Sequence, residues 1–536
     1  KVPAPTFCPD CRLQRRLMFV NERNLYKRKC DLCGKEIITI ISPDKPYKVY
    51  CNPCWWSDKW DPMDYGADYD SAKNFFEQLK KLQLRVPMFP AIADYPTMIN
   101  SDYTNYSGHL KNCYLIFDTD TCENCYYSGL IIESKDTMDV FMVLKGESNY
   151  QSINCNKCSN VYFSEGCEES YEVYFSKNLI GCNNCFGCIN LKHKKYHIFN
   201  EPYSKEEYQK KLKEYNLSSY QELQRIKTEV YKFWEKHPHK FSHQRKNNNV
   251  SGDYIYNSKN VHNSYYVFGA EDCKYCHFLS MRPTKDAYDY TVWGDNAQRI
   301  YECMTVGEGV SDIKFSFFCF RQGTLELEYS ITSFSSSNLF GSVGLRKKQY
   351  CILNKQYSEF EYHNLRERII KDMNDNPYID SKGRKFAYGE FFPYELSLFD
   401  YNETLAQDYF PLTKEGVKER GFAWKEKESK DYQFQTYNIP DDIKEVKDDI
   451  LEVIFACQEC GRNYRIIKPE LELLRKWKFP IPRKCFDCRH KERLKRANPI
   501  KFYKRQCAKC QKEIITNFAP ERPEMVYCEK CYLKEV

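Results

Sequence analysis

Pairs of cysteines separated by two residues occur at both ends of the chain. Of all the residues in the sequence, these have the spacing that most clearly indicates a chemical role, which is metal binding. Such a pair places two thiolates on one turn, and two pairs complete the tetrahedral set of four soft donors that Zn²⁺ prefers. We therefore predict Zn²⁺ as a cofactor, held by cysteines of both ends: Cys8, Cys11, Cys30, Cys33, Cys51, Cys54, Cys457, Cys460, Cys485, Cys488, Cys507, Cys510, Cys528 and Cys531.

The two terminal cysteine sets are copies of one module. Each of the six N-terminal cysteines has a counterpart 477 residues later, without an insertion. The counterpart of Cys457 and Cys460 would precede the first residue, so we expect Cys8 and Cys11 to be half a site in a truncated module. The four C-terminal pairs could hold two ions in either of two ways. In a cross-braced arrangement the first pair joins the third and the second joins the fourth, whereas in a consecutive arrangement neighbouring pairs share an ion. We favour consecutive pairing because Ile514 to Phe518 can form a hairpin strand between neighbouring pairs.

Further cysteines lie in the middle of the chain, and two interpretations of them stay open. They could bind metal, or they could form ladders in the interior of repeated coils, because a free cysteine packs like a small apolar residue. The candidate ligands are Cys122, Cys125, Cys155, Cys158, Cys182, Cys185, Cys188, Cys273 and Cys276.

Basic and aromatic residues between the cysteine pairs also recur at the 477-residue offset. Guanidinium groups four residues apart share one helix face and suit phosphate oxygens, and tyrosine rings can stack on exposed bases. The alternative is that these charges solvate a small module or contact protein. The candidate nucleic-acid contacts are Arg12, Arg16, Tyr26, Lys27 and Arg28 in the first copy, and Arg489, Arg493, Tyr503, Lys504 and Arg505 in the second.

The charge distribution favours a polyanionic partner. Residues 1 to 54 carry a net charge of +6 and residues 478 to 536 carry +9, so the body between them carries −8 of the total of +7. Basic ends on an acidic middle indicate a polyanion held at the ends. No apolar run approaches the roughly 20 residues that span a bilayer, so we expect no membrane partner. The cysteine pairs favour metal over disulfides and hence a reducing cytoplasm.

Catalysis has little support in the sequence. We find no nucleotide-binding glycine loop, no HExxH motif and no nucleophile elbow. Matched aspartates occur at Asp136 and Asp139 and again at Asp286 and Asp289, but in a coiled repeat an aspartate is more often a turn former. We expect a protein without enzymatic activity.

The body that must position these modules is predicted to be mainly β with some α. From Tyr103 onward, short segments of about 11 to 14 residues follow one another, each with a small polar residue before aromatic or aliphatic ones. This texture is typical of a β-solenoid, with β-sandwich-like repeats as the alternative. The body is itself duplicated at offsets of 151 and 154 residues, and each copy ends in a predicted helix, roughly Lys205 to Lys236 and Ser358 to Met373.

These patterns divide the chain into seven segments. We predict, in order, a truncated zinc-ribbon module, a helical connector, a first repeat module with its terminal helix, a linker, a second repeat module with its helix, a connector, and a double zinc ribbon. Their ranges are 1–60, 61–102, 103–236, 237–252, 253–374, 375–450 and 451–536. The connector 61–102 should hold an amphipathic helix from Ser71 to Val86.

The C-terminal segment resembles a known family. Cys457 to Gly461, then Tyr464, Pro480, Pro482 and Cys485 to Arg489, is similar to a zinc-ribbon family that alternates C-x2-C-G, an aromatic residue and P-x-x-C-x-x-C-R. Cys507 to Tyr532 looks like a second small bacterial ribbon family. As a whole the chain resembles uncharacterised cysteine-rich bacterial proteins with such ribbons at both ends. The resemblance implies zinc and a ribbon fold, and it implies no activity.

Three functions follow as hypotheses. The first is a non-enzymatic zinc protein that binds nucleic acid or a ribonucleoprotein through its basic ribbon segments. The second is a zinc-stabilised scaffold whose ribbons contact other proteins. The third is a nucleic-acid-processing enzyme with a site in the body.

Overall fold

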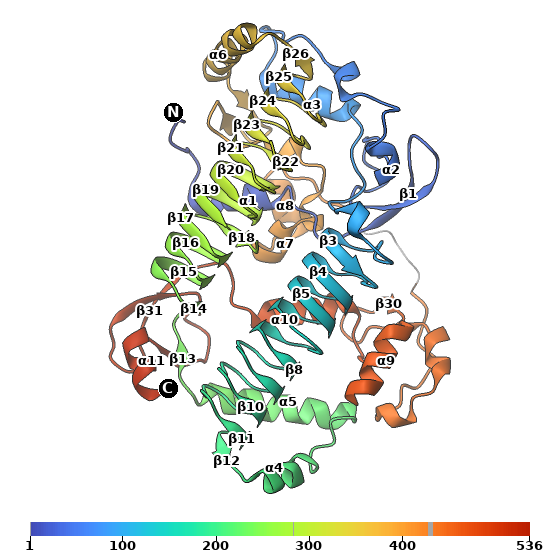
Figure 1. The fold of residues 1–536 in the computed structure, drawn as a ribbon, viewed down its shortest axis with the longest axis vertical. Coiled ribbons are helices and arrows are strands. Elements are labelled where there is room, and N and C mark those ends of the chain that lie inside the picture. The colour runs from blue at the N-terminus through green and yellow to red at the C-terminus, as the bar shows by residue number, and fades with distance from the viewer. Residues whose placement is uncertain (1, 282, 427–431) are drawn as a thin grey trace. The chain divides into compact units, whose positions relative to one another are not determined.

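The computed structural model of the chain describes residues 2–281, 283–426 and 432–536. It divides into two compact units. Unit 1 comprises Lys1–Ile92 and Ser242–Glu426, and unit 2 comprises Ala93–Phe241 and Lys427–Val536. The fold is mainly β with about 24% helix, and each unit is built on a parallel β-solenoid that is accompanied by groups of four cysteines (Figure 1). The solenoid prediction is confirmed, and the sandwich alternative is not.

The solenoid of unit 2 advances twelve residues per turn. Asn105 pairs in parallel with Phe117, Phe117 with Gly129, and Gly129 with Phe141. Two parallel sheets run β3 to β7 and β8 to β11, and β12 adds an antiparallel edge. The strands are β3 (Asn105–Lys111), β4 (Phe117–Tyr126), β5 (Gly129–Met138), β6 (Phe141–Leu144), β7 (Ile153–Asn156), β8 (Ser159–Tyr162), β9 (Tyr171–Tyr174), β10 (Asn183–Phe186), β11 (Lys195–Ile198) and β12 (Glu201–Pro202).

A left-handed backbone conformation at every third residue closes each turn. Asn112, Asp118 and Asn124 have φ near +53°, and the pattern continues along the solenoid. Asparagine and aspartate tolerate this conformation better than other non-glycine residues, because a short polar side chain can hydrogen-bond locally. These asparagines and aspartates therefore stand at corners of the coils, and larger residues such as Tyr127 occupy other corners.

The interior of this solenoid is filled by stacked small and aliphatic side chains. Leu110, Ile131 and Val143 pack there among buried cysteines. Serines in the same stacks satisfy backbone carbonyls: the Ser152 hydroxyl donates to Tyr150 O at 3.1 Å and to Val161 O at 2.9 Å. Buried polar groups of each turn are thus hydrogen-bonded within the turn and to the next one, and such contacts between neighbouring turns stabilise a solenoid.

The solenoid of unit 1 has less regular turns. Asn248 pairs with Lys259 eleven residues on, whereas Ser311 pairs with Leu325 fourteen residues on. Its strands are β14 (Gln244–Arg245), β15 (Asn248–Tyr256), β16 (Lys259–Phe268), β17 (Ala270–Lys274), β18 (His277–Leu279), β19 (Thr284–Trp293), β20 (Ala297–Gly307), β21 (Ser311–Lys314), β22 (Phe317–Phe320), β23 (Leu325–Glu328), β24 (Ser337–Phe340), β25 (Gln349–Ile352) and β26 (Lys355–Gln356).

Helices follow both solenoids, as the duplication predicts. In unit 2 these are α4 (Lys205–Leu212) and α5 (Tyr220–Glu235), with β13 (His239–Lys240) after them, and in unit 1 it is α6 (Glu359–Asp375). Ser204 and Ser358 begin α4 and α6 with a full capping box, which satisfies exposed N–H groups. The predicted linker 237–252 contains β13, β14 and the start of β15.

The remaining elements of unit 1 hold the N-terminal cysteines and their surroundings. They are α1 (Pro9–Leu17), β1 (Tyr26–Lys29), β2 (Glu36–Thr39), α2 (Asn52–Trp55), η1 (Pro62–Tyr65), α3 (Phe75–Arg85), β27 (Tyr378–Ile379), β28 (Lys385–Phe386), η3 (Tyr394–Leu396), η4 (Tyr401–Glu403), α7 (Leu405–Tyr409) and α8 (Lys414–Glu419). The helix predicted from Ser71 to Val86 is α3, capped by Asn74 rather than by Ser71.

The remaining elements of unit 2 carry the C-terminal cysteines. They are η2 (Tyr95–Thr97), η5 (Ile443–Glu445), η6 (Asp448–Glu452), β29 (Phe455–Ala456), β30 (Asn463–Tyr464), α9 (Lys468–Trp477), α10 (Phe486–Arg496), β31 (Tyr503–Gln506), β32 (Glu513–Thr516), β33 (Val526–Tyr527) and α11 (Glu529–Glu535). The expected hairpin strand between the last two pairs is β32, which pairs antiparallel with β31.

Candidate metal centres

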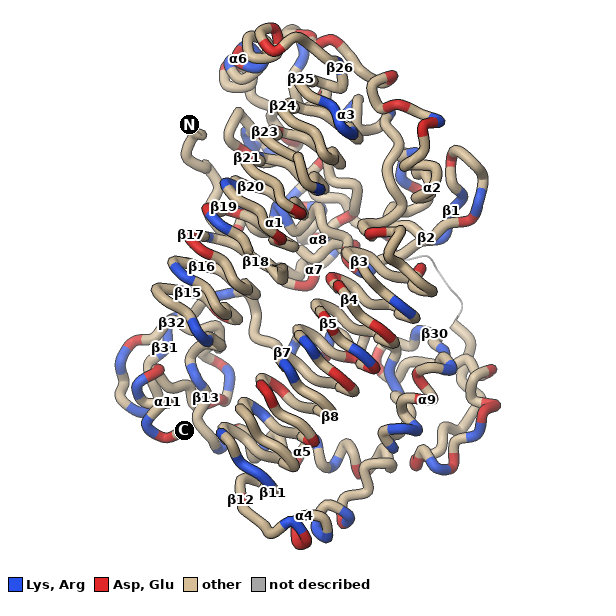
Figure 2. The backbone as a smooth tube through the Cα atoms, in the orientation of Figure 1, with Lys and Arg blue, Asp and Glu red and all other residues tan. Residues whose placement is uncertain are grey.

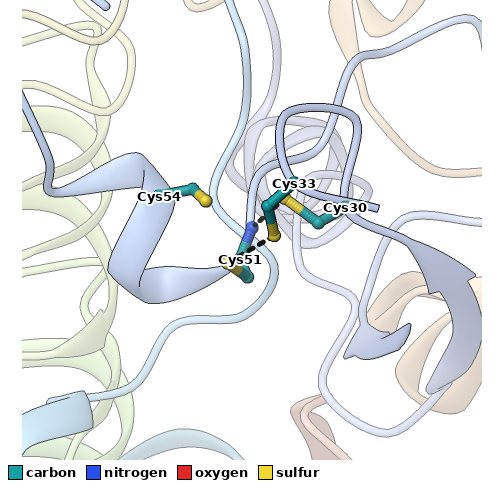
Figure 3. Close-up of side chains that lie close together, drawn as sticks. All are labelled: Cys30, Cys33, Cys51 and Cys54. Atoms are coloured by element: carbon teal, nitrogen blue, oxygen red, sulfur yellow. Dashed lines mark hydrogen bonds between the residues drawn. The ribbon is translucent and has the colours of Figure 1, made fainter. Parts of the chain in front are cut away.

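Three groups of four cysteines have sulfur atoms close enough to hold one ion each. Within each group all four sulfur atoms lie within 4.8 Å of one another: Cys30, Cys33, Cys51 and Cys54 in unit 1, then Cys457, Cys460, Cys485 and Cys488, and Cys507, Cys510, Cys528 and Cys531 in unit 2. Figure 3 shows the first group. In each group consecutive pairs meet, as the sequence analysis favoured, and the cross-braced arrangement does not occur among these described residues.

The first pair of each group sits on a tight turn stabilised by backbone bonds. Cys30 N–H donates to Lys35 O at 2.8 Å, and Gly34 N–H donates to Cys30 O at 2.9 Å. Gly34 has φ of +74°, a left-handed conformation that glycine adopts at little cost. Cys457 and Cys507 begin turns with the same bonds, so three separate sequences build one local structure.

The second pair of each group begins a helix. Cys51, Cys485 and Cys528 are the N-cap residues of α2, α10 and α11. The unpaired N–H groups and the positive end of the dipole at a helix N-terminus favour a thiolate over a thiol. Burial outweighs this effect at two of these residues, because it raises the pKa of Cys51 and raises that of Cys485 to about 12.

The sulfur spacing fits a tetrahedral metal site. The Sγ atoms of Cys33 and Cys51 are 3.8 Å apart, and those of Cys460 and Cys485, and of Cys510 and Cys528, are also 3.8 Å apart. A tetrahedron with metal–sulfur bonds of about 2.3 Å has edges of about 3.8 Å. A disulfide would bring the atoms to about 2.05 Å, so the spacing in these groups is compatible with a bound metal ion and does not match disulfide bonds.

Backbone hydrogen bonds also favour ionisation of the first cysteine of each group. Burial raises the pKa of Cys30, but N–H groups that include those of Cys51 and Cys33 outweigh it and lower the pKa to about 7. The same balance lowers the pKa of Cys457 to about 7 and that of Cys507 to about 6. Since the thiolate is the metal-binding form, the folded ribbons present one ready ligand each.

Cys8 and Cys11 form a separate pair at the start of α1. Cys11 N–H donates to the Cys8 sulfur at 3.3 Å, and both residues are exposed. Partial desolvation of the thiol and the adjacent Cys8 raise the pKa of Cys11 to about 11. Within the described residues no other cysteine joins them in a group of three or more.

The cysteines of the body line the interiors of the solenoids. None of the candidate ligands from Cys122 to Cys276 belongs to a metal-sized group within the described residues. The Cys125 thiol donates to Glu123 O at 3.4 Å and Ser134 O at 3.5 Å, the same kind of contact that serine makes in other turns. Burial and the thiols of Cys113 and Cys122 raise the pKa of Cys125 well above its usual value. These cysteines pack as small buried side chains in the cores of the solenoids.

In unit 2, the matched arginines lie inside the protein. Arg493 Nη1 lies 2.9 Å from Asp139 Oδ1 and its Nη2 donates to Tyr127 O at 3.1 Å, while Arg489 contacts Asp139 at 3.2 Å and Glu470 at 2.9 Å. The relative exposures of Arg493 and Arg489 are 1% and 4%. Because both follow Cys488 on α10, their ion pairs with Asp139 fasten the cysteine-bearing helix to the solenoid.

Unit 1 repeats this arrangement with its own residues. On α1, Arg12 Nε lies 2.8 Å from Asp289, and Arg16 contacts Asp289 at 3.0 Å and Glu302 at 3.2 Å. Arg16 is fully buried. Asp289 holds the place in the second repeat that Asp139 holds in the first, so these two of the four aspartates noted in the sequence are partners of the arginines rather than only turn formers. Sequence reasoning did not pair them.

Two further arginines form ion pairs of this kind, but the 477-residue duplication does not indicate them. Arg15 bridges Glu302 and Glu390 at 2.9 Å each, and Arg496 contacts Glu165 at 2.7 Å. The residue 477 positions after Arg15 is a glutamate, so the offset could not reveal it.

The other candidate nucleic-acid contacts divide by exposure. Tyr26 donates to the Glu403 carboxylate, and Arg28 donates to Tyr47 O at 3.0 Å. Arg505 donates to Ala519 O at 3.1 Å and to Glu524 O at 3.2 Å, and Tyr503 is half-buried. Lys27 on β1 and Lys504 on β31 are exposed (Figure 2 marks the charges along the chain). The ribbon surface thus offers lysines, while the arginines point inward.

Two further features of the described chain concern the other hypotheses. Apart from the three four-cysteine groups, no cluster of His, Cys, Asp or Glu of metal-binding size occurs among the described residues. No helix within the described ranges is long and apolar enough to cross a membrane.

Comparison with known protein families gave no match, and neither did comparison with curated proteins. Among solved structures, the chain is similar to a crystal structure described as that of a "putative acetyltransferase" from Desulfovibrio desulfuricans. The sequence identity is 10%, the match covers 53% of this chain and 84% of that chain, and the TM-score is 0.11. A TM-score this low carries no argument about fold or function.

Proposed function

We propose that the protein is a zinc-stabilised, non-enzymatic binding protein of a reducing compartment, the cytoplasm, that holds nucleic acid or a ribonucleoprotein against the lysines of its ribbons. The observation that carries the proposal is the threefold repetition of a four-cysteine site with tetrahedral sulfur spacing. An all-thiolate tetrahedral set without oxygen donors selects zinc or iron among biological metals, and closed four-ligand sites are structural.

Metal content is the first test. The purified protein should contain three Zn²⁺ per chain by elemental analysis, and Cys457→Ser should lower this to two, because the remaining donors cannot close the tetrahedron. Cys125→Ser is the matched control, since it replaces a solenoid cysteine outside the four-cysteine groups. Iron in place of zinc, or equal metal loss in both variants, would overturn the zinc assignment.

The exposed lysines of the last ribbon support the nucleic-acid part of the proposal. Lys501, Lys504 and Lys512 are exposed on or beside the hairpin of β31 and β32. Exposed lysines of a ribbon can neutralise phosphates, and each neutralised phosphate releases bound counterions. Affinity should therefore fall steeply as salt rises.

The test compares two triple variants of equal charge change. Lys501→Ala, Lys504→Ala and Lys512→Ala together should weaken binding to a labelled 30-nucleotide RNA and lower its salt slope by about 0.7 per lost contact. The control changes three exposed solenoid lysines, Lys111, Lys145 and Lys157, to alanine. Equal effects of the two variants, or no binding by the wild type at low salt, would overturn this part.

A scaffold function is the second candidate, and the burial of the arginines favours it. Arg12, Arg16, Arg489 and Arg493 are all occupied by carboxylates of the same unit. Arginines that are held by internal carboxylates are not available to phosphates, so their burial supports the scaffold over a nucleic-acid grip by these four residues. Copurifying protein without nucleic acid would support the scaffold.

A further inference from the structure

A groove in unit 2 lies between the first turns of the solenoid and helix α9. Its volume is about 770 Å³, and its lining comes from residues 100–136 on one side and residues 467–476 on the other. Both sides belong to the same unit. Because none of the metal-site cysteines lines it, the metal sites do not account for it.

One wall of the groove is a ladder of side-chain amides that ends in a carboxylate. Asn100 donates to Asn112 Oδ1 at 3.1 Å, Asn112 donates to Asn124 Oδ1 at 3.3 Å, and Asn124 donates to Asp136 Oδ1 at 2.9 Å. Each amide has two N–H donors and an oxygen with two lone pairs, and the ladder uses only part of them. The groove therefore presents a row of groups that can both donate and accept.

Three tyrosines stand beside this ladder. Tyr103 and Tyr114 have ring centroids 5.3 Å apart, and Tyr126 lines the groove one turn further on. No hydrogen bond joins any of their hydroxyls to another residue in the described part of the chain. Burial raises the pKa of Tyr126 to about 12, so its hydroxyl stays a neutral donor. Rigid rings with unused hydroxyls are typical of contact surfaces for peptides.

The charge of the lining selects the ligand. Asp102, Asp136 and Glu472 carry three negative charges against the one positive charge of Lys476, which lies 3.3 Å from Asp136. A net negative groove disfavours a polyphosphate and favours a cationic partner. The faces of the tyrosine rings add attraction for a guanidinium or an ammonium group.

We infer that this groove binds an extended peptide segment that carries lysine or arginine. Main-chain N–H and C=O groups pair with the ladder amides, and the cationic side chains meet Asp102 and Glu472. Neighbouring turns are about 4.8 Å apart, so two turns match the length of about three extended residues. The amides of the groove thus contact the backbone of the peptide, and the carboxylates of the groove contact its cationic side chains. This site is independent of the ribbon lysines of the proposed function.

The other solenoid supplies a matched control. In unit 1, Asn249 donates to Asn260 at 2.9 Å, and Asn260 donates to Asp272 at 2.9 Å, which repeats the ladder chemistry. Replacing Asn260 removes one accepted and one donated ladder bond, as replacing Asn112 does, but leaves the groove of unit 2 unchanged. Neither replacement changes the net charge, so a difference between them reports the groove and not general attraction to the acidic body.

The test measures binding of three labelled decapeptides, (Ala-Lys)5, (Ala-Gln)5 and (Ala-Glu)5, to the zinc-loaded full chain by fluorescence anisotropy. The lysine peptide should bind most tightly. Asn112→Ala should weaken its binding about fivefold, as expected for one or two lost hydrogen bonds, while Asn260→Ala leaves it unchanged. Tyr114→Phe removes only a hydroxyl and serves as the second variant if Asn112→Ala reduces stability.

Three results would overturn the inference. One is equal binding of the three peptides, and another is an equal effect of Asn112→Ala and Asn260→Ala with no effect of Tyr114→Phe. The third is displacement of the peptide by a neutral oligosaccharide such as cellohexaose at lower concentration, since hydroxyl groups could use the same amides. RNA binding by the ribbon lysines should persist in the groove variants, which separates the two proposals.

Discussion

Neutralising Asp139 should release helix α10 from the solenoid of unit 2. In the native structure two guanidinium groups, on Arg489 and Arg493, share the two carboxylates of Asp139 and Glu470, and all four side chains are at most 4% exposed. The substitution Asp139→Asn keeps the shape of the side chain. It also suits the local backbone, because asparagine tolerates the φ of +54° at this position. It leaves one buried positive charge without a partner.

The expected cost follows from that uncompensated charge. Breaking a buried ion pair by removing one partner costs about 3–5 kcal/mol, which raises the population of the detached helix roughly 150-fold to 4000-fold. Asp448→Asn is the control, because Asp448 is 79% exposed where it pairs with Arg475, and an exposed pair contributes at most about 1 kcal/mol.

Hydrogen exchange on the zinc-loaded protein measures this directly. In Asp139→Asn, amides of residues 486–496 should exchange faster by the factor above, while Asp448→Asn changes them less than about fivefold. Asp289→Asn should have the corresponding effect on α1 in unit 1, where Arg12 and Arg16 lose their shared partner. If α10 stays as protected in Asp139→Asn as in Asp448→Asn, the ion pairs do not fasten the helix and this reasoning fails.

Three further predictions concern the ribbons and the core. Gln511→Gly should strengthen zinc binding by about 1 kcal/mol in competition with a chelator, because Gln511 holds φ of +60° where Gly461 stands in the neighbouring site; an unchanged affinity would count against it. Burial raises the pKa of Glu165, but Lys177 and Arg496 outweigh it and lower the pKa from 4.5 to about 2, so the carboxylate contributes stability above about pH 4.5 that disappears toward pH 2. Glu165→Gln should therefore cost more in urea unfolding at pH 6 than at pH 3, and equal costs would refute this. Cys125→Ser should keep three metal ions and lose no more than about 1 kcal/mol in the same assay, since serine makes the same contacts elsewhere in the solenoid.

The repeated local patterns of this chain made its architecture predictable. A small polar residue such as Asn124 beside Tyr126 marks a corner and a strand of one coil, and the same pairing of residue types returns turn after turn. The role of the cysteine pairs was equally predictable, because four thiolates at this fixed spacing have few functions other than metal binding. Turn length was less predictable: the unit 1 turns vary from eleven to fourteen residues, because insertions at solenoid corners cost little.

Long-range pairing could not be read in the same way. Arg493 and Asp139 are 354 residues apart, and neither the spacing of arginines on a helix nor an aspartate at a corner says that the two meet. The duplication nevertheless contained information about this pairing. Arg16 and Asp289 repeat Arg493 and Asp139, so two duplications kept both members of a charge pair. The peptide groove gave no signal, since α9 and the amide ladder lie over 300 residues apart.

The burial of these arginines decides which variant can test nucleic-acid binding. To reach a phosphate, Arg489 or Arg493 would first have to leave its carboxylates, at a cost of about 3–5 kcal/mol, whereas an exposed charge pair returns at most about 1 kcal/mol. Replacing them with alanine would weaken RNA binding by detaching the ribbon even if they never touch RNA. Exposed Lys504 and its neighbours carry no such internal contact to a buried acid among the described residues. A loss of affinity in the lysine variant with unchanged hydrogen exchange in α10 would therefore report the interface itself, and the same loss in an arginine variant would not.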